Sequence, residues 1–190
     1  MRIGLLGGSF DPPHMGHLLA ASDAFEALAL DRLIFVPASS QPLKAGRANA
    51  SPEQRLTMAR LLAGDDSRFA VDSIEIDRGG LSYTVDTLTT LAARWPSAEL
   101  FWLVGADVPR SFAKWRSPER IVELATVVVL QRAGETPDVA SMPGRPRCLP
   151  TRRIDISSTE IRDRVREGKS IRGFVPDAVA AYIQAERLYR

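Results

Sequence analysis

Short apolar runs alternate with amphipathic stretches along almost the whole chain, and this alternation constrains the fold more than any other feature. Five runs are typical of strands; they span residues 2–7, 32–37, 68–77, 99–105 and 126–131. Six stretches have helical spacing of apolar residues; they span 16–30, 51–64, 84–96, 117–125, 157–168 and 176–189. Strands that alternate with helices favour a parallel sheet covered by those helices. We therefore expect an α/β fold, a doubly wound and mainly parallel sheet with helices on both faces.

Two of the expected helices begin with capping signals. Ser51 precedes a proline and is followed three residues later by Gln54, and Ser157 is followed at the same distance by Glu160. A serine with glutamate or glutamine three residues on is the pattern of a capping box. Residues 132–150 are rich in proline and glycine, and we expect them to form one long loop.

The composition limits the class of protein. A length of 190 residues predicts one domain, residues 1–190, with a sizeable core. The hydrophobic fraction of 45% is ordinary, and no apolar run approaches the roughly 18 residues of a membrane span. The first residues lack the pattern of a signal or transit peptide, and a single cysteine, Cys148, fits a reducing compartment. We therefore expect a cytoplasmic protein that has no membrane partner.

The stretch after the first expected strand holds both histidines of the chain. It runs GGSFDPPHMGH over residues 7–17, with His14 and His17 three positions apart. It matches neither the dinucleotide-binding glycine pattern nor the P-loop. The two glycines nevertheless let backbone amides approach an anion, and a helix begins near Gly16 with its positive end facing the loop. Ligands of doubly wound sheets bind beyond the carboxyl ends of the strands, so we predict a phosphate site here.

The histidines have two other interpretations. A transition-metal site would need further ligands, but the chain has no third histidine and Cys148 is remote in sequence. Both histidines could instead be structural, which would be the default for an isolated H-x-x-H pattern. The glycines, the preceding strand and the following helix favour the phosphate site.

Four further stretches follow expected strands or begin helices at the same edge of the sheet. In chain order they contribute Lys44; Tyr83 and Thr84; Gly105, Asp107 and Trp115; and Ser157, Ser158 and Arg162. Each has an ordinary explanation when taken singly, such as a solvated lysine or a core tryptophan. Together they bring a second helix N-terminus, a lysine and an arginine to the edge that holds the histidines. The combination predicts a site for polyphosphate.

The motif GGSFDPPHMGH together with ISSTEIR at 156–162 resembles the nucleotidyltransferase superfamily with the [HT]-x-G-H signature. With SYTVDTL, GAD and FAKW added, the chain is similar to the bacterial nicotinate-nucleotide adenylyltransferases over nearly its full length. The H-x-G-H element alone identifies only the superfamily, whereas the five motifs in this order are specific to the narrower family. The resemblance implies a Rossmann-like nucleotidyltransferase fold.

The resemblance also implies two sets of site residues. Those for ATP are Gly8, Ser9, Phe10, His14, His17, Gly105, Asp107, Ile156, Ser157, Ser158 and Arg162. Those for the nicotinate nucleotide are Lys44, Tyr83, Thr84 and Trp115. The residues expected to stabilise the reacting phosphates, and so to be catalytic, are His14, His17, Lys44 and Arg162. The family often has proline before S-Y-T, where this chain has Leu81, so it departs from the pattern on the acceptor side.

The implied reaction is adenylyl transfer from ATP to nicotinate mononucleotide, which gives deamido-NAD and pyrophosphate in NAD biosynthesis. The nucleophile is a phosphate monoester with a second pKa of about 6, so it needs no general base at neutral pH. The enzyme has to place two anions in line and stabilise the charge on the leaving pyrophosphate. We expect Mg²⁺ to arrive with ATP, no dedicated protein metal site and no covalent enzyme intermediate.

Other functions stay open on the sequence alone. The acceptor of a sibling enzyme would be nicotinamide mononucleotide or pantetheine phosphate, and the aromatic residues of SYTVDTL and FAKW argue against the second. A non-catalytic nucleotide sensor would not need both histidines. Residues 151–172 contain seven basic and four acidic residues, which suggests a solvated face, so we expect no nucleic-acid partner. The sequence leaves the oligomeric state open, a homo-oligomer included.

Overall fold

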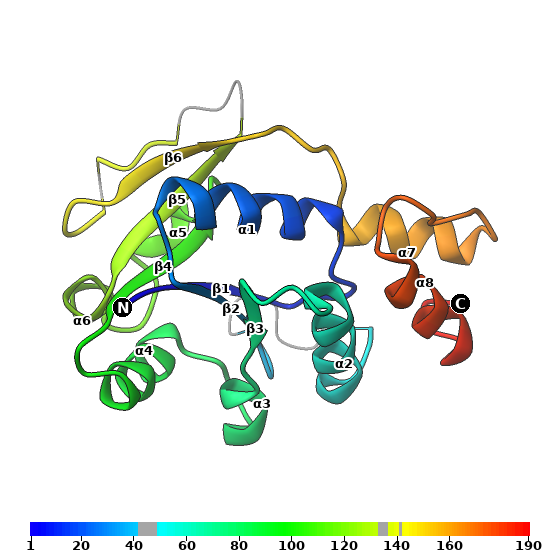
Figure 1. The fold of residues 1–190 in the computed structure, drawn as a ribbon, viewed down its shortest axis with the longest axis horizontal. Coiled ribbons are helices and arrows are strands. Elements are labelled where there is room, and N and C mark those ends of the chain that lie inside the picture. Colours follow the sequence, from blue (N-terminus) through cyan, green and yellow to red (C-terminus); the bar gives the residue numbers. More distant parts are fainter. Residues whose placement is uncertain (42–48, 133–136, 141) are drawn as a thin grey trace.

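The centre of the computed structural model is a six-stranded sheet (Figure 1), and the structure describes residues 1–41, 49–132, 137–140 and 142–190. The strands are β1 (Arg2–Gly8), β2 (Arg32–Pro37), β3 (Phe69–Val71), β4 (Glu99–Gly105), β5 (Thr126–Arg132) and β6 (Arg147–Thr151). Their order in the sheet is β3-β2-β1-β4-β5-β6, and every pairing among them is parallel. The chain therefore leaves β1 toward one edge of the sheet and later returns to build the other half from β4 outward.

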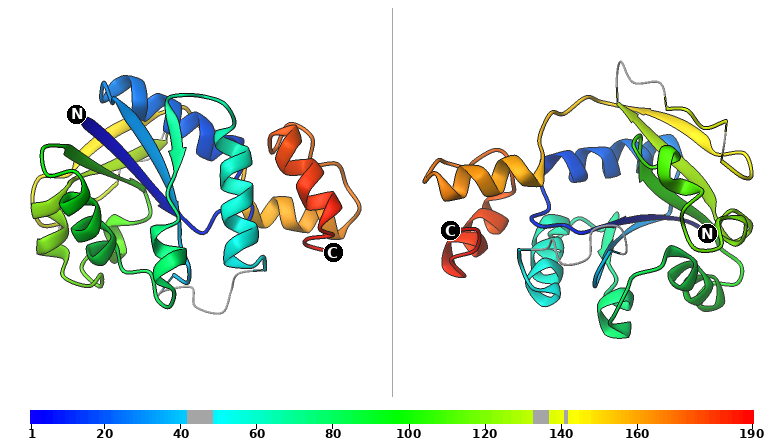
Figure 2. Two further views of the ribbon diagram at one scale, coloured as in Figure 1. Left: turned by 60° about the horizontal axis from the view of Figure 1, so that its bottom comes forward. Right: turned by 180° about the vertical axis from the view of Figure 1, so that it is seen from behind.

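Helices cover both faces of the sheet, as Figures 1 and 2 show. One face carries α1 (Met15–Ala27) and α2 (Pro52–Ala63). The other carries α3 (Ile74–Arg78), α4 (Thr84–Arg94), α5 (Pro109–Phe112) and α6 (Pro118–Leu124). The last two helices, α7 (Ser158–Arg166) and α8 (Asp177–Ala185), lie beyond the sheet and pack with residues of α2. The expected doubly wound α/β fold is confirmed.

The central strands are buried on both faces. In β2, Leu33 and Phe35 pack in the cluster that includes α1 and α2, whereas Ile34 and Val36 pack in the cluster that includes α3 to α6. Successive side chains of a strand point to opposite faces, so a central parallel strand needs apolar residues at every position. This is why these strands appear in the sequence as continuous apolar runs.

The prediction of a single strand over residues 68–77 is wrong. β3 ends at Val71, and the chain turns into α3 at Ile74. The side-chain Oδ1 of Asp72 accepts a hydrogen bond from the backbone N–H of Ile74 at 3.0 Å. Aspartate that bonds to the backbone two residues on favours a turn over a continued strand.

The long loop expected over residues 132–150 is also wrong at its end. Residues Arg147–Thr151 form β6, which pairs with β5 from Val128 opposite Arg147 to Arg132 opposite Thr151. β6 is an edge strand, is mostly not buried and contains Pro150, so it has no continuous apolar run. Its strand conformation comes from pairing with β5 and not from its own composition.

The capping signals behave as expected at α2. The backbone N–H of Gln54 donates to Ser51 Oγ at 3.2 Å, and the backbone N–H of Ser51 donates to Gln54 Oε1 at 2.9 Å. At α7, Ser157 Oγ accepts from the backbone N–H of Glu160 at 3.1 Å. Both helix starts are therefore fixed by their own local sequence.

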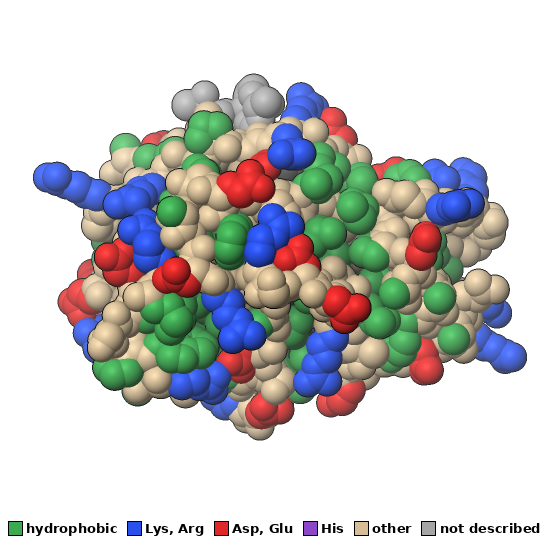
Figure 3. All heavy atoms as spheres, in the orientation of Figure 1, with side chains coloured by type: hydrophobic (Ala, Val, Ile, Leu, Met, Phe, Trp, Pro, Cys, Tyr) green, Lys and Arg blue, Asp and Glu red, His purple; other side chains and the backbone are tan. Residues whose placement is uncertain are grey.

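The surface is mixed in charge on the face that Figure 3 shows. Basic and acidic side chains lie intermixed across the middle of this face, in keeping with a formal net charge of +2. None of the helices in the described part of the chain is both long and apolar enough to cross a membrane.

Candidate active site

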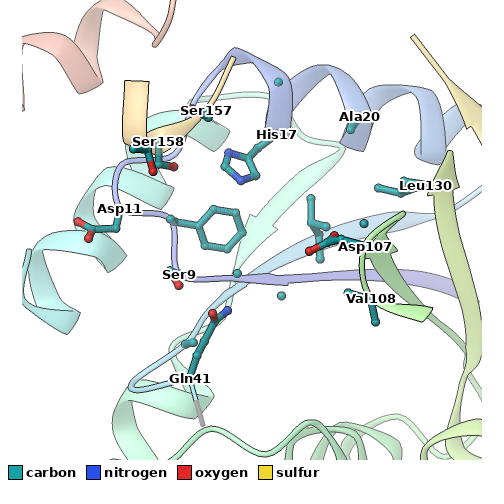
Figure 4. Close-up of a pocket in the computed structure, with 18 of the residues that line it drawn as sticks. Ser9, Asp11, His17, Ala20, Gln41, Asp107, Val108, Leu130, Ser157 and Ser158 are labelled. Carbon is teal, nitrogen blue, oxygen red and sulfur yellow. The ribbon is translucent and has the colours of Figure 1, made fainter. Parts of the chain in front are cut away.

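A cavity of about 910 Å³ opens at the carboxyl ends of β1 and β4 (Figure 4). The strand order reverses between these two strands, which is where doubly wound sheets bind their ligands. The predicted ATP residues that line it are Gly8, Ser9, Phe10, His17, Gly105, Asp107, Ser157, Ser158 and Arg162. The structure therefore brings together all of that set except His14 and Ile156. The volume is in the range of sites for nucleotide-sized ligands.

His17 points from the first turn of α1 into this cavity (Figure 4). Its Nδ1 accepts a hydrogen bond from the backbone N–H of His14 at 3.2 Å. An imidazole that accepts at Nδ1 carries its proton on Nε2 when it is neutral. His17 is therefore set to donate from Nε2. The ring of Phe10 contacts the imidazole edge-on, with 5.1 Å between ring centroids.

His14 occupies a different position from His17. It is the N-cap residue of α1, it is buried, and it does not line the cavity. Its ring lies 3.8 Å from the ring of His17, centroid to centroid. The structure thus places His14 as a direct neighbour of His17, and its own contact with phosphate stays a prediction.

Two glycines let the backbone of the cavity wall come close to neighbouring side chains. A Cβ on Gly8 would lie 3.1 Å from the Phe10 ring, and one on Gly105 would lie 2.7 Å from Asp107 Oδ1. Phe10 itself adopts a φ of 50°, a left-handed conformation that is costly for a non-glycine residue. Burial of its ring, edge-on against Phe35 at 5.8 Å, holds this conformation.

The N-terminus of α7 is fastened to the loop between β1 and α1. Ser158 Oγ donates to the backbone oxygen of Pro12 at 2.8 Å, and Arg162 Nη1 donates to that of Asp11 at 2.8 Å. The N-termini of α1 and α7 therefore meet at one cavity, as the sequence predicts. Arg162 Nε is buried and has no hydrogen-bond partner among the described residues.

The predicted acceptor residues form a separate group. Lys44 lies outside the described residues. Tyr83 and Thr84 are the N-cap and first residue of α4, as expected, and Trp115 packs half-buried against the core with its ring 5.2 Å from that of Phe112. None of these three residues lines the cavity within the part of the chain that the structure describes. The cavity therefore gathers most of the ATP set but none of the described acceptor residues.

The acceptor group is joined to the cavity rim by hydrogen bonds of Ser82. Its Oγ accepts from the backbone N–H of Ser39 at 2.9 Å, and its own N–H donates to Ser40 O at 2.8 Å. Ser39 and Ser40 both line the cavity. Behind Ser82, the buried Glu75 carboxylate accepts from Thr87 Oγ1 at 2.6 Å. Burial raises the pKa of Glu75, and hydrogen bonds from Thr87 and Ser82 oppose that rise.

Comparison with known proteins gives the family. A family model described as cytidylyltransferase-like matches residues 5–164. A probable nicotinate-nucleotide adenylyltransferase from Gemmatimonas aurantiaca is 51% identical, over 100% of this chain and 93% of its own length. One of the same name from Thermus thermophilus is 49% identical over 100% of both chains. The chain belongs to the cytidylyltransferase-like family and, within it, to the nicotinate-nucleotide adenylyltransferases.

Solved structures agree with this family in fold. The nicotinic acid mononucleotide adenylyltransferase of Plasmodium falciparum, complexed with NaAD, has a TM-score of 0.80 and 18% identity, over 99% of this chain and 97% of its own. The structure of a protein from Vibrio parahaemolyticus described as a putative nicotinate-nucleotide adenylyltransferase has a TM-score of 0.71 and 23% identity, over 100% of this chain and 95% of its own. The resemblance inferred from the five motifs is confirmed, and so is the Rossmann-like nucleotidyltransferase fold.

Arg55 is one of the lining residues of the adenylyltransferase cavity that were not predicted from the sequence. Arg55 lines the cavity although its side chain is only 1% exposed. Its Nη1 donates to Ser9 O and its Nη2 to Ser39 O, both at 2.8 Å, so it ties the loop after β1 to the loop after β2. Burial lowers the pKa of Arg55, and the Asp11 carboxylate opposes that shift. The sequence offered one indication that Arg55 is buried: it lies on the same helical face as Met58 and other buried apolar residues of α2.

No group of three or more histidine, cysteine, aspartate or glutamate side chains in the described ranges is arranged to hold a metal ion. Two acidic residues, Asp11 and Asp107, are among the described residues that line the cavity. Figure 4 shows Asp107 pointing into the cavity and the carboxylate of Asp11 turned away from it.

Proposed function

We infer that the protein is an enzyme that transfers the adenylyl group of ATP to nicotinate mononucleotide, giving deamido-NAD and pyrophosphate. The observation that carries this inference is the meeting of two helix N-termini, those of α1 and α7, at one cavity. Helix N-termini attract anions through free N–H groups and the helix dipole. Two helix N-termini at one cavity, in a chain of this family, can together bind a triphosphate.

The proposed position of ATP follows from the donors in the cavity wall. The triphosphate lies between the two helix N-termini, where His17 Nε2–H and the guanidinium of Arg162 donate to its oxygens. The buried and unpaired Nε of Arg162 supports this placement, because a buried donor without a partner is costly until a ligand satisfies it. The adenosine ribose lies beside Gly105 and Asp107, whose carboxylate points into the cavity.

The chemistry then needs placement and charge stabilisation. A phosphate oxygen of nicotinate mononucleotide attacks the α-phosphorus of ATP, a new O–P bond forms, and the bond from that phosphorus to pyrophosphate breaks. The attacking group is already mostly dianionic at neutral pH, so no residue has to remove a proton. His17 and Arg162 stabilise the charge that grows on the leaving pyrophosphate, with His14 and Lys44 as the other proposed contributors.

A magnesium ion fits this donor set only as a companion of ATP. Both oxygens of the Asp11 carboxylate already accept hydrogen bonds, from Asn49 N–H at 2.8 Å and Ala50 N–H at 3.1 Å. Among the described residues that line the cavity, Asp107 is then the one whose carboxylate faces it. This suffices for Mg²⁺, which is commonly bound by one or two carboxylates together with substrate phosphates and water. We propose Mg²⁺ as the cofactor, where it neutralises charge on the phosphates.

The proposed acceptor site lies next to the cavity, around Tyr83, Thr84 and Trp115. The indole of Trp115 stacks on the pyridinium ring, where aromatic contact and the positive charge of the ring both contribute. Backbone amides directed at the nicotinate carboxylate would lose their partner with nicotinamide, at about 1–3 kcal/mol for each buried group. We therefore expect kcat/KM to favour nicotinate mononucleotide over the nicotinamide form by at least about tenfold.

A pyrophosphate-release assay with ATP, Mg²⁺ and each acceptor tests this function. Nicotinate mononucleotide should be the best acceptor, nicotinamide mononucleotide at least about tenfold poorer, and pantetheine phosphate inactive. Equal use of the two mononucleotides would contradict the proposed selectivity. Release that requires pantetheine phosphate would replace the proposed acceptor altogether.

Replacing Trp115 with alanine should raise KM for both mononucleotides by about tenfold and leave KM for ATP within twofold, because only the acceptor contacts the indole. Trp95→Ala is a matched control, since Trp95 also packs partly buried against the same core cluster but lies at the far end of α4. A larger loss of ATP binding than of acceptor binding in Trp115→Ala would refute the stacking role.

A further inference from the structure

Three buried polar side chains from distant parts of the chain meet behind the loop between β1 and α1. Asp11, Arg55 and Tyr189 are 5%, 1% and 8% exposed. Burying charged and polar groups is costly unless each is paired or hydrogen-bonded. The mechanism above uses none of the three directly, so their burial calls for another explanation.

Asp11 is bonded on two sides. Its carboxylate Oδ1 accepts from the hydroxyl of Tyr189 at 2.8 Å and from the backbone N–H of Ala50 at 3.1 Å, and its Oδ2 accepts from Asn49 N–H. On the other side, its backbone oxygen accepts from Arg162 Nη1 at 2.8 Å. The same residue therefore joins Tyr189 to the arginine that faces the cavity.

Tyr189 reaches Asp11 through a specified turn after α8. The backbone N–H of Leu188 donates to Ile183 O at 3.0 Å, and both Arg187 and Tyr189 adopt left-handed φ angles of 54° and 65°. Such angles cost free energy for non-glycine residues and persist where surrounding contacts determine them. Burial and the neighbouring Asp11 carboxylate raise the pKa of Tyr189, so its hydroxyl keeps the proton it donates.

The ring and the hydroxyl of Tyr189 have separable roles. The ring packs in the cluster that joins α2, α7 and α8, together with Met58 and Ile161. Phenylalanine would keep that packing and lose the bond to Asp11, together with a long 3.9 Å contact of the hydroxyl with Met58 Sδ. A change of tyrosine to phenylalanine therefore isolates the hydroxyl, whose nearest polar partner is the Asp11 carboxylate.

We propose that Tyr189 is a positioning residue for adenylyl transfer: through Asp11, its hydroxyl holds the backbone oxygen that orients the Arg162 guanidinium toward the triphosphate. Arg55 fixes the same loop from its other side, through Ser9 O. The segment after α8 thus takes part in building the ATP site although it lies outside the cavity lining. This inference rests on the proposed function, because it assigns Tyr189 a part in the same reaction.

The test compares Tyr189→Phe with wild type in kcat/KM for ATP, KM for nicotinate mononucleotide, and the dissociation constant of a non-hydrolysable ATP analogue. Loss of one hydrogen bond to a charged group is expected to lower kcat/KM for ATP and analogue affinity about tenfold. KM for the acceptor should stay within twofold. Tyr182→Phe is the matched control, because Tyr182 lies on α8 and packs partly buried against the same cluster.

A double variant separates positioning from general support of the fold. In an Arg162→Ala background, Tyr189→Phe should lower kcat/KM for ATP and analogue affinity by less than twofold, because the guanidinium that Tyr189 positions is gone. A tenfold loss of kcat/KM for ATP that persists in that background would overturn the proposal. So would a Tyr189→Phe variant that impairs use of the acceptor as much as use of ATP. Analogue affinity unchanged by Tyr189→Phe would overturn it too, and this readout stands even if the wild type fails to use nicotinate mononucleotide.

Discussion

Changing His17 to alanine is expected to lower kcat by about 10²–10³-fold, the scale found when one donor to developing charge is removed from an active site. His17 lines the cavity, and because its Nδ1 accepts from the His14 N–H, the neutral ring carries its proton on Nε2. Alanine removes that donor and leaves the other cavity residues in place. Initial rates of pyrophosphate release at saturating ATP and nicotinate mononucleotide measure the effect.

The stability of the His17 variant provides the control. Loss of the bond from His14 N–H removes a capping interaction at the start of α1, which costs about 1 kcal/mol and lowers the Tm by only a few degrees. A folded variant with a large loss of kcat is therefore the expected result. If kcat stayed within threefold of wild type, His17 would not be the donor that stabilises the transition state.

Arg162→Ala is expected to lower kcat/KM for ATP by about 10- to 150-fold, which corresponds to one hydrogen bond to a charged group at roughly 1.5–3 kcal/mol. The guanidinium is held at the cavity by Asp11 O and Thr159 Oγ1, at 2.8 and 3.2 Å, and its Nε lacks a partner among the described residues. The ratio of kcat/KM for the two mononucleotide acceptors should not change, because the proposed contacts are to polyphosphate.

Arg164 is a suitable control on the same helix. Its Nε donates to Ser170 O at 2.8 Å and its guanidinium lies over the ring of Phe174, so it contacts the segment after α7. Arg164→Ala should leave kcat/KM for ATP and for the acceptor within twofold of the wild-type values. A shift in acceptor preference in Arg162→Ala, with ATP parameters unaltered, would show that this helix start serves the acceptor instead.

The central strands and the ATP half of the site were predictable because their signals are local. A buried parallel strand is a continuous apolar run, and both phosphate motifs begin a helix directly after extended chain. β6 gave no such signal, since an edge strand with Pro150 depends on its partner β5. The turn at Asp72 shows the opposite case, in which a single side-chain bond stops a strand that the composition favours.

The rest of the site depends on contacts between distant segments. Tyr189 and Asp11 are 178 residues apart, and no spacing rule connects them. Arg55 carried a weak local signal, a charge on an apolar helical face, but its partners lie in two loops that only the folded sheet brings together. Trp115 was expected at the ligand edge, but its ring packs against Phe112 and it does not line the cavity among the described residues.

The central claim is that the adenylyl group moves from ATP directly to the acceptor. Its most direct test supplies wild-type protein with ATP labelled at the α-phosphorus, together with Mg²⁺ and nicotinate mononucleotide, and follows the label and the pyrophosphate in parallel. We predict one labelled deamido-NAD for each pyrophosphate released, and no label bound covalently to the protein. Label that stays in ATP, or that leaves as AMP while nicotinate mononucleotide remains unchanged, would contradict the account.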